Sequence, residues 1–211
     1  MLHHAARAVP WGRVALAAGL VLVLMELVRW NPWVLWPLEG TAVGLLAGAA
    51  AWCFDETAAA VVDTLPRGLA WRAAARSPAV LLLILTWAFA VVRVGNGAAF
   101  GHTEAVLVQG LAAVATGAAL ACWRRAQGEA SPGLLFAAAI VPVATAWALV
   151  RPFGDHLAVF PAGTTSAHAW HLSTAGWATA GVLAGLLVIA ALTDAPWWHL
   201  HTWSTRLHDL P

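Results

Sequence analysis

The chain has 211 residues, of which 61% are hydrophobic and only 10% are charged. A soluble globular domain carries roughly 25% charged residues, so this composition excludes an ordinary water-soluble protein. The formal net charge is +1, and binding to nucleic acid requires a clustered basic face. We therefore expect no nucleic-acid partner.

Six apolar runs are long enough to cross a membrane, because a hydrocarbon layer about 30 Å thick needs roughly 20 helical residues. We expect spans at residues 12–30, 33–54, 78–95, 104–123, 133–150 and 173–193. These runs predict an all-α polytopic membrane protein in which residues 1–211 form a single transmembrane domain.

The basic residues predict the orientation of these spans. With a cytoplasmic N-terminus, the outer ends hold Arg29, Arg93 and Arg151, and the inner segments hold the larger set: Arg7, Arg13, Arg67, Arg72, Arg76, Arg124, Arg125 and Arg206. An arginine excess on the cytoplasmic side is the usual bias of membrane proteins. We therefore expect both termini in the cytoplasm and the chain in a lipid bilayer.

The first two spans contain acidic residues in their outer halves, Glu26 and Glu39. An unpaired carboxylate inside a membrane is costly and should face protein or water. Arg29 and Arg93 lie at a comparable depth, so one interpretation is a structural layer of ion pairs. The other is a substrate path or outer gate formed by Glu26, Glu39 and Arg93. Glu39 is the better candidate because no basic residue on its own helix can neutralise it.

The second span also carries glycines at a spacing of four, Gly40, Gly44 and Gly48. Such a stripe leaves one helix face without side chains, so a neighbouring backbone can approach closely. It predicts helix packing and says little about function. The two cysteines, Cys53 and Cys122, are interpreted as small apolar fillers.

Residues 55–77 form a long connection between the second and third spans. Asp55 or Thr57 can cap a short helix, which Pro66 interrupts. The apolar members of this helix recur at helical spacing: Ala58, Val61, Val62 and Leu65. A second short helix is expected to follow, and it carries Arg67, Trp71, Arg72 and Arg76. We expect a helical hairpin on the inner membrane surface, with its arginines facing lipid phosphates or another protein. An amphipathic interfacial helix without a partner is the alternative.

The outer segment, residues 151–172, is expected to form a re-entrant or surface-lying pair of short helices. His168 and His171 share one helical face as candidate metal ligands, and Asp155 and His156 could complete such a site. No spacing here is diagnostic, so no metal is expected. The tail, residues 194–211, is expected to lie on the inner surface.

The connection after the second span resembles the coupling-helix region of ABC-2-type permeases, the membrane subunits of many bacterial exporters. The matching positions are Glu56, Asp63-Thr64-Leu65-Pro66-Arg67 and Ala75-Arg76. Six spans, both termini inside and long segments after spans two and five also fit that family. The resemblance implies a permease subunit in the bacterial cytoplasmic membrane, paired with a second permease subunit of the same or a different chain.

The same resemblance implies that separate ATPase subunits dock on this connection. The residues that it assigns to docking are Asp55, Glu56, Asp63, Thr64, Leu65, Pro66 and Arg67. The chain has no G-x-x-x-x-G-K-[ST] motif, so ATP and Mg²⁺ are expected on the partner, with no cofactor and no enzymatic activity here.

Three other functions remain open. They are the six-helix substrate-binding component of an importer, a membrane-embedded enzyme and an accessory membrane protein. The long 55–77 connection favours the permease over the importer component, and no nucleophile–base pair supports an enzyme.

Overall fold

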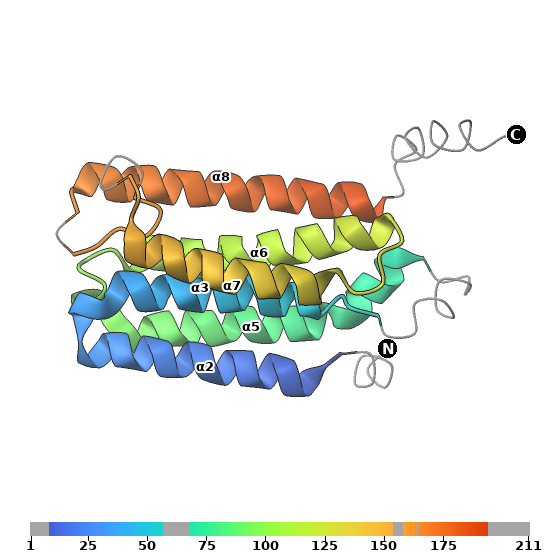
Figure 1. The fold of residues 1–211 in the computed structure, drawn as a ribbon, viewed down its shortest axis with the longest axis horizontal. Coiled ribbons are helices and arrows are strands. Elements are labelled where there is room, and N and C mark those ends of the chain that lie inside the picture. Colours follow the sequence, from blue (N-terminus) through green and yellow to red (C-terminus); the bar gives the residue numbers. More distant parts are fainter. Residues whose placement is uncertain (1–8, 57–67, 154–157, 164, 194–211) are drawn as a thin grey trace, which may run out of the picture.

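The computed structural model describes residues 9–56, 68–153, 158–163 and 165–193, and all regular structure in these ranges is helical. Six of the described helices are long and apolar enough to span a membrane. In chain order the elements are α2 (Trp11–Trp30), the 3₁₀ turn η1 (Pro32–Val34), α3 (Leu35–Trp52), α5 (Leu69–Ala98), α6 (Thr103–Ala126), α7 (Pro132–Val150) and α8 (Ala167–Leu192) (Figure 1). The expected class, an all-α protein with six membrane-spanning helices, is confirmed.

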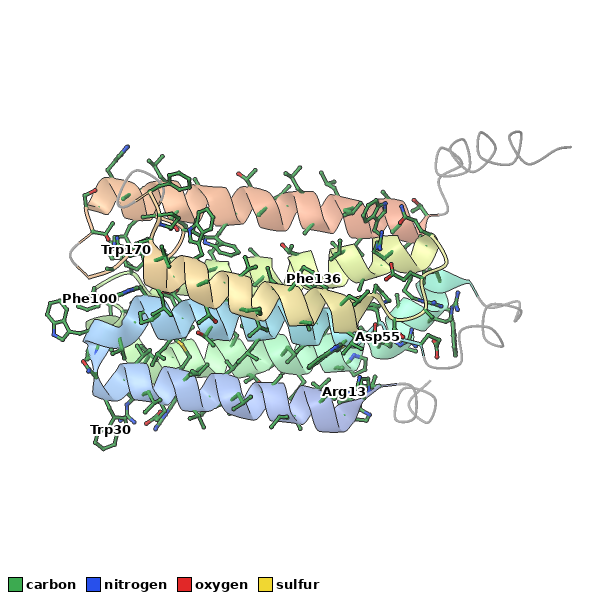
Figure 2. The ribbon with its side chains drawn as sticks, in the orientation of Figure 1. Arg13, Trp30, Asp55, Phe100, Phe136 and Trp170 are labelled. Atoms are coloured by element: carbon green, nitrogen blue, oxygen red, sulfur yellow. The ribbon has the colours of Figure 1, made fainter. Side chains whose placement is uncertain are left out.

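Two helices, α3 and α6, form the centre of the bundle and are its most buried spans. They contact each other, and α2 and α5 complete a four-helix unit with them. α7 packs mainly on α3, and α8 packs mainly on α6. Figure 1 shows α2 and α8 at opposite edges of the molecule. Figure 2 shows Arg13 and Asp55 at one end of the bundle and Trp30, Phe100 and Trp170 at the other. These are called the Asp55 end and the Trp30 end.

The peripheral helices expose large apolar side chains along their outer faces. Examples are Leu16, Leu20 and Leu27 on α2, Leu81, Leu85 and Val92 on α5, and Val182, Leu186 and Ile189 on α8. Exposed apolar side chains along several helices mark contact with a membrane or another protein. Because these helices are long enough to span a bilayer, the hydrocarbon of a membrane is the environment that fits this apolar surface.

The glycine stripe of α3 packs against α7, and the expected close approach is confirmed. A Cβ added at Gly40, Gly44 or Gly48 would lie 2.5, 3.1 and 2.9 Å from the Cβ of an alanine on α7. These alanines are Ala148, Ala144 and Ala137 respectively. The Thr41 and Thr145 hydroxyls lie 3.0 Å apart and join the same two helices. Small residues therefore bring two backbones together, as in other membrane bundles.

The central contact between α3 and α6 is even closer. A Cβ added at Gly117 would lie 2.0 Å from the carbonyl oxygen of Ala47. Nearer the Trp30 end, the indole of Trp87 from α5 covers Gly110, and its Nε1 donates to the carbonyls of Val106 and Leu107 at 3.2 and 3.1 Å. The buried indole therefore satisfies its donor against α6 backbone.

Helix α5 begins at Leu69 and runs without interruption through Pro78. The expected boundary at residue 78, and the separate second short helix of the 55–77 connection, were therefore wrong. Pro78 lacks the N–H that would bond the Ala74 carbonyl, and the Ser77 hydroxyl donates to that oxygen instead, at 2.8 Å. A neighbouring serine can satisfy such a carbonyl and keep the helix continuous. The expected first short helix, at residues 57–65, lies outside the described residues.

Helix α8 begins at Ala167, where the Ser166 side chain accepts from the Ala169 N–H at 3.3 Å. Residues 167–172 therefore belong to α8. The described residues before it, 151–153, 158–163 and 165–166, contain no helix. Residues 154–157 and 164 lie outside the described residues, so the expected pair of short helices stays a prediction there. The Val159 carbonyl accepts from the Trp177 indole at 3.0 Å, which fastens the segment to α8. The expected surface tail, residues 194–211, lies outside the described residues.

Candidate functional site

The connection that follows α3 is anchored at the Asp55 end of the bundle. Asp55 Oδ1 accepts from the Gly133 N–H at 2.6 Å, and the Glu56 N–H donates to the Ala130 carbonyl at 2.9 Å. The Glu56 carboxylate forms an ion pair with Arg76 on α5. Two consecutive acidic residues thus join the end of α3 to the start of α7 and to α5.

Asp55 serves as the N-terminal cap of a helix that is distant in sequence. Ser131 comes directly before the first residue of α7, but its side chain makes no capping hydrogen bond. Free backbone N–H groups therefore remain at the N-terminus of α7. Partial burial raises the pKa of the Asp55 carboxyl, and the N–H groups of Gly133 and Leu134 act in the opposite direction by stabilising the ionised form. The carboxylate also faces the positive end of the α7 dipole.

Arg76 lies inside the protein, with 2% of its side chain exposed. The expectation that this arginine faces lipid phosphates or another protein was therefore wrong. A buried guanidinium must be paired, and Glu56 supplies the carboxylate. The remaining docking residues expected from the resemblance, Asp63, Thr64, Leu65, Pro66 and Arg67, lie outside the described residues. Docking of a partner on Asp55 and Glu56 remains a prediction.

An apolar groove runs beside this anchor, between α5, α6 and α8. Its volume is about 640 Å³. Its lining includes Phe54 next to Asp55, the Ser77–Pro78 step, Cys122 on α6 and Leu192 at the end of α8. Within the described chain, α5 and α8 make no substantial contact with each other. The groove is therefore an opening between two helices that share α6 as its floor.

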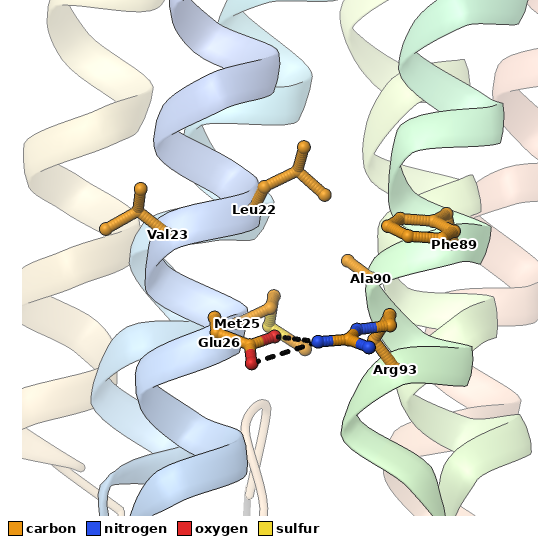
Figure 3. Close-up of a pocket in the computed structure, with 7 residues that line it drawn as sticks. All are labelled: Leu22, Val23, Met25, Glu26, Phe89, Ala90 and Arg93. Atoms are coloured by element: carbon orange, nitrogen blue, oxygen red, sulfur yellow. Dashed lines mark hydrogen bonds and ion pairs between the residues drawn. The ribbon is translucent and has the colours of Figure 1, made fainter.

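The second group of expected residues meets at the Trp30 end. Glu26 Oε1 on α2 lies 2.5 Å from Arg29 Nη1 and 3.2 Å from Arg93 Nη2 on α5. The Glu26, Arg29 and Arg93 side chains are 37, 43 and 48% exposed, so this cluster faces outward from the bundle. Figure 3 shows Glu26 and Arg93 bridging α2 and α5 beside Leu22 and Phe89. The expected ion pairing is present, on the outer surface of the four-helix unit.

Glu39 is placed differently from the other two path candidates. Its side chain is fully buried, and neither carboxylate oxygen has a hydrogen-bond partner. Glu39 precedes Gly44 by five residues, which is about 140° around a helix. It therefore lies on the side of α3 turned away from α7, where α3 meets the rest of the four-helix unit. An ionised carboxylate there without a partner costs several kcal/mol.

Gln109 is a buried polar residue that the sequence analysis missed. It lies on α6, and neither its amide nitrogen nor its oxygen has a partner. The signal that could have found it is an uncharged polar side chain well inside an apolar span, because hydrocarbon cannot satisfy such a group. Each of the two central helices, α3 and α6, therefore carries a buried polar side chain without a hydrogen-bond partner, Glu39 and Gln109 respectively.

The two described histidines of the outer segment belong to α8. His168 and His171 are exposed on α8, and no group of three or more ligating side chains occurs among the described residues. Asp155 and His156 lie outside those residues. His102 instead stacks on Trp170, with ring centroids 4.2 Å apart. Burial lowers the pKa of His102, and the nearby His171 adds to the effect.

The six helices long and apolar enough to span a membrane indicate a multi-pass membrane protein. Comparison of the chain with protein-family models, curated proteins and solved structures finds no match in any of the three.

Proposed function

We propose that the chain is the permease subunit of an ATP-driven exporter of the ABC-2 type. In this proposal it forms a translocation path with a second permease subunit and receives mechanical work from separate ATPase subunits. ATP and Mg²⁺ would be bound by those partners, in a bacterial cytoplasmic membrane. The resemblance of residues 55–76 to a coupling region is the starting point.

One structural observation supports this proposal above the others. The segment that would receive the ATPase lies between Glu56, four residues after the end of α3, and Leu69, the first residue of α5. Glu56 is tied to α5 through Arg76 and to the start of α7 through Ala130, and Asp55 caps α7. Movement of this segment would therefore be transmitted to three spanning helices, α3, α5 and α7. A loop anchored at one point could not do this.

The interior of the bundle contains polar side chains that could line a translocation path. Glu39 and Gln109 are buried in spanning helices without partners, and such polar groups within membranes commonly mark substrate pathways. The groove beside the anchored segment is apolar. Together these features favour a substrate with a large lipophilic part and a polar group.

Copurification tests the proposed coupling. The chain is purified from its native membrane, and bound proteins are identified by mass spectrometry. We expect an ABC-type ATPase with the wild-type chain and its loss, by tenfold or more, when Leu65, Pro66 and Arg67 are all replaced by glycine. The matched control replaces Gln127 and Glu129, in the α6–α7 connection at the same end, by glycine, so that residues 127–129 are also three consecutive glycines, and we expect it to retain the ATPase.

Two results would contradict the proposal. The first is the absence of any ATPase from the wild-type preparation. The second is equal retention by the Leu65-Pro66-Arg67 variant and the wild type. Both variants must elute as a single species of wild-type size, so that loss of the partner is not loss of the fold.

A further inference from the structure

The cluster of Glu26, Arg29 and Arg93 carries more positive than negative charge. Two guanidinium groups share one carboxylate oxygen, Glu26 Oε1, which leaves a formal charge of +1. Each guanidinium has five N–H donors, and nearly half of each arginine side chain is exposed. Donors therefore remain available on the outer side of the cluster, and the ligand that they fit is an anion.

The position of the Glu26–Arg29–Arg93 cluster indicates that the anion is a lipid headgroup. Glu26 precedes the end of α2 by four residues, which is about 6 Å along the axis, and Arg93 precedes the helix break at Gly95 by two. Trp30 at the end of α2 is 81% exposed, as expected for an indole at the membrane–water interface. The cluster thus lies on the lipid-facing surface near the depth of the headgroups.

An apolar crevice adjoins the charged groups. A cavity of about 330 Å³ between α2 and α5 is lined by Leu22, Val23, Met25, Phe89 and Ala90, together with Glu26 and Arg93. Figure 3 shows Leu22 and Phe89 further along the two helices, on one side of the Glu26–Arg93 pair. The site is therefore polar at one end and apolar along its length, which is the distribution of polarity in a phospholipid.

We propose that this crevice binds an anionic phospholipid, with its phosphate on Arg29 and Arg93 and an acyl chain along Leu22 and Phe89. The planar guanidinium forms paired hydrogen bonds to phosphate oxygens. The excess positive charge favours a lipid with net negative charge over a zwitterionic one, although both contain phosphate. This inference does not depend on the proposed transport function, because it concerns only α2, α5 and the surrounding leaflet.

Native mass spectrometry of the purified full-length chain tests the proposal. The chain is titrated with phosphatidylglycerol and with phosphatidylcholine of the same acyl chains. We expect preferential retention of phosphatidylglycerol. One arginine near an anionic lipid contributes about 1 kcal/mol, so Arg29→Gln and Arg93→Gln should each weaken that binding about fivefold. The control is Arg124→Gln, because Arg124 is similarly exposed and paired with one carboxylate, Glu129 at 2.5 Å, but lies at the other end of the bundle.

Two further measurements separate a lipid site from a structural ion pair. Glu26→Gln raises the formal charge of the cluster to +2, so a lipid site predicts tighter phosphatidylglycerol binding by this variant. A structural pair predicts an unchanged ratio between the two lipids. Glycerophosphoglycerol, which carries the headgroup without acyl chains, should fail to displace the bound lipid, because it cannot fill the crevice.

The proposal is overturned if the wild-type chain retains both lipids equally or if Arg93→Gln keeps the wild-type preference. It is also overturned if the Arg124→Gln control loses as much binding as the cluster variants, since the effect would then be that of any surface arginine. If glycerophosphoglycerol displaced the bound lipid when added at the same concentration as that lipid, the proposed acyl-chain contact with Leu22 and Phe89 would be excluded.

Discussion

At the scale of single residues, charged side chains at the Asp55 end take roles that the sequence did not specify. Asp55 or Thr57 was expected to cap the following short helix, which lies outside the described residues, and docking of a partner on Asp55 stays a prediction. The structure shows that Asp55 caps α7, 78 residues further along the chain. Arg76 was expected on the surface and instead pairs with Glu56 inside the fold. The Glu26–Arg29 pair was foreseeable because three residues bring side chains to one helix face. The other two contacts join distant parts of the chain, which local spacing cannot show.

Replacing Asp55 tests its role as a cap. Asp55→Ala removes the oxygen that accepts from the Gly133 N–H, and loss of an N-cap costs about 1 kcal/mol. Asp55→Asn keeps an oxygen in the same place and should stay closer to the wild type. We expect a lower midpoint of unfolding by SDS in mixed micelles for the alanine variant of the isolated chain. Equal midpoints for alanine and asparagine would contradict a capping role.

At the scale of helices, a glycine correctly predicted where the regular geometry of α5 breaks, whereas a proline did not mark where this helix begins. Pro78 was interpreted as the start of a span, but the Ser77 hydroxyl satisfies the carbonyl that the proline leaves free, and the helix continues. Gly95 was expected to end the span, and regular helical geometry does break there, at φ +72° and ψ 172°. A glycine permits this break whatever surrounds it, whereas the effect of a proline depends on its neighbours.

A matched pair of glycines tests the break in α5. Gly95 adopts backbone angles that only glycine reaches readily, and such strain costs an alanine about 1–3 kcal/mol. Gly97 has φ outside that region, and an added Cβ at either position meets nothing within 4 Å. We expect Gly95→Ala to lower the SDS unfolding midpoint and Gly97→Ala to leave it unchanged or slightly raised. Equal midpoints for the two variants would show that the break imposes no constraint.

At the scale of the whole molecule, the number of spans was predictable and their packing was not. Length and apolar content alone indicate a crossing, because hydrocarbon requires about 20 residues of helix with satisfied backbone bonds. The glycine stripe of α3 predicted a close neighbour without identifying α7 as that neighbour. Likewise, Glu39 was recognisable as costly, but its burial among the central helices depends on which helices surround α3. Neighbour choice is set by many weak contacts between distant segments.

The central contact between α3 and α6 should therefore limit the stability of the whole bundle. A Cβ at Gly117 would lie 2.0 Å from the Ala47 carbonyl oxygen, which is backbone and cannot rotate away. The two central helices would have to separate, and overpacking of this kind typically costs about 1–3 kcal/mol. Gly19 on α2 is the control, because it is helical and exposed and an added Cβ there meets nothing within 4 Å. Gly19→Ala should gain up to about 1 kcal/mol from helix propensity.

We expect Gly117→Ala to lower the SDS unfolding midpoint and Gly19→Ala to leave it unchanged or raise it. Loss of helical circular dichroism and the change in tryptophan fluorescence should shift together in Gly117→Ala, because α3 and α6 connect all the other spanning helices. A Gly117→Ala protein as stable as Gly19→Ala would mean that α3 and α6 can separate at no cost. The remaining helices would then have to hold the bundle through α2–α5 and the peripheral contacts of α7 and α8.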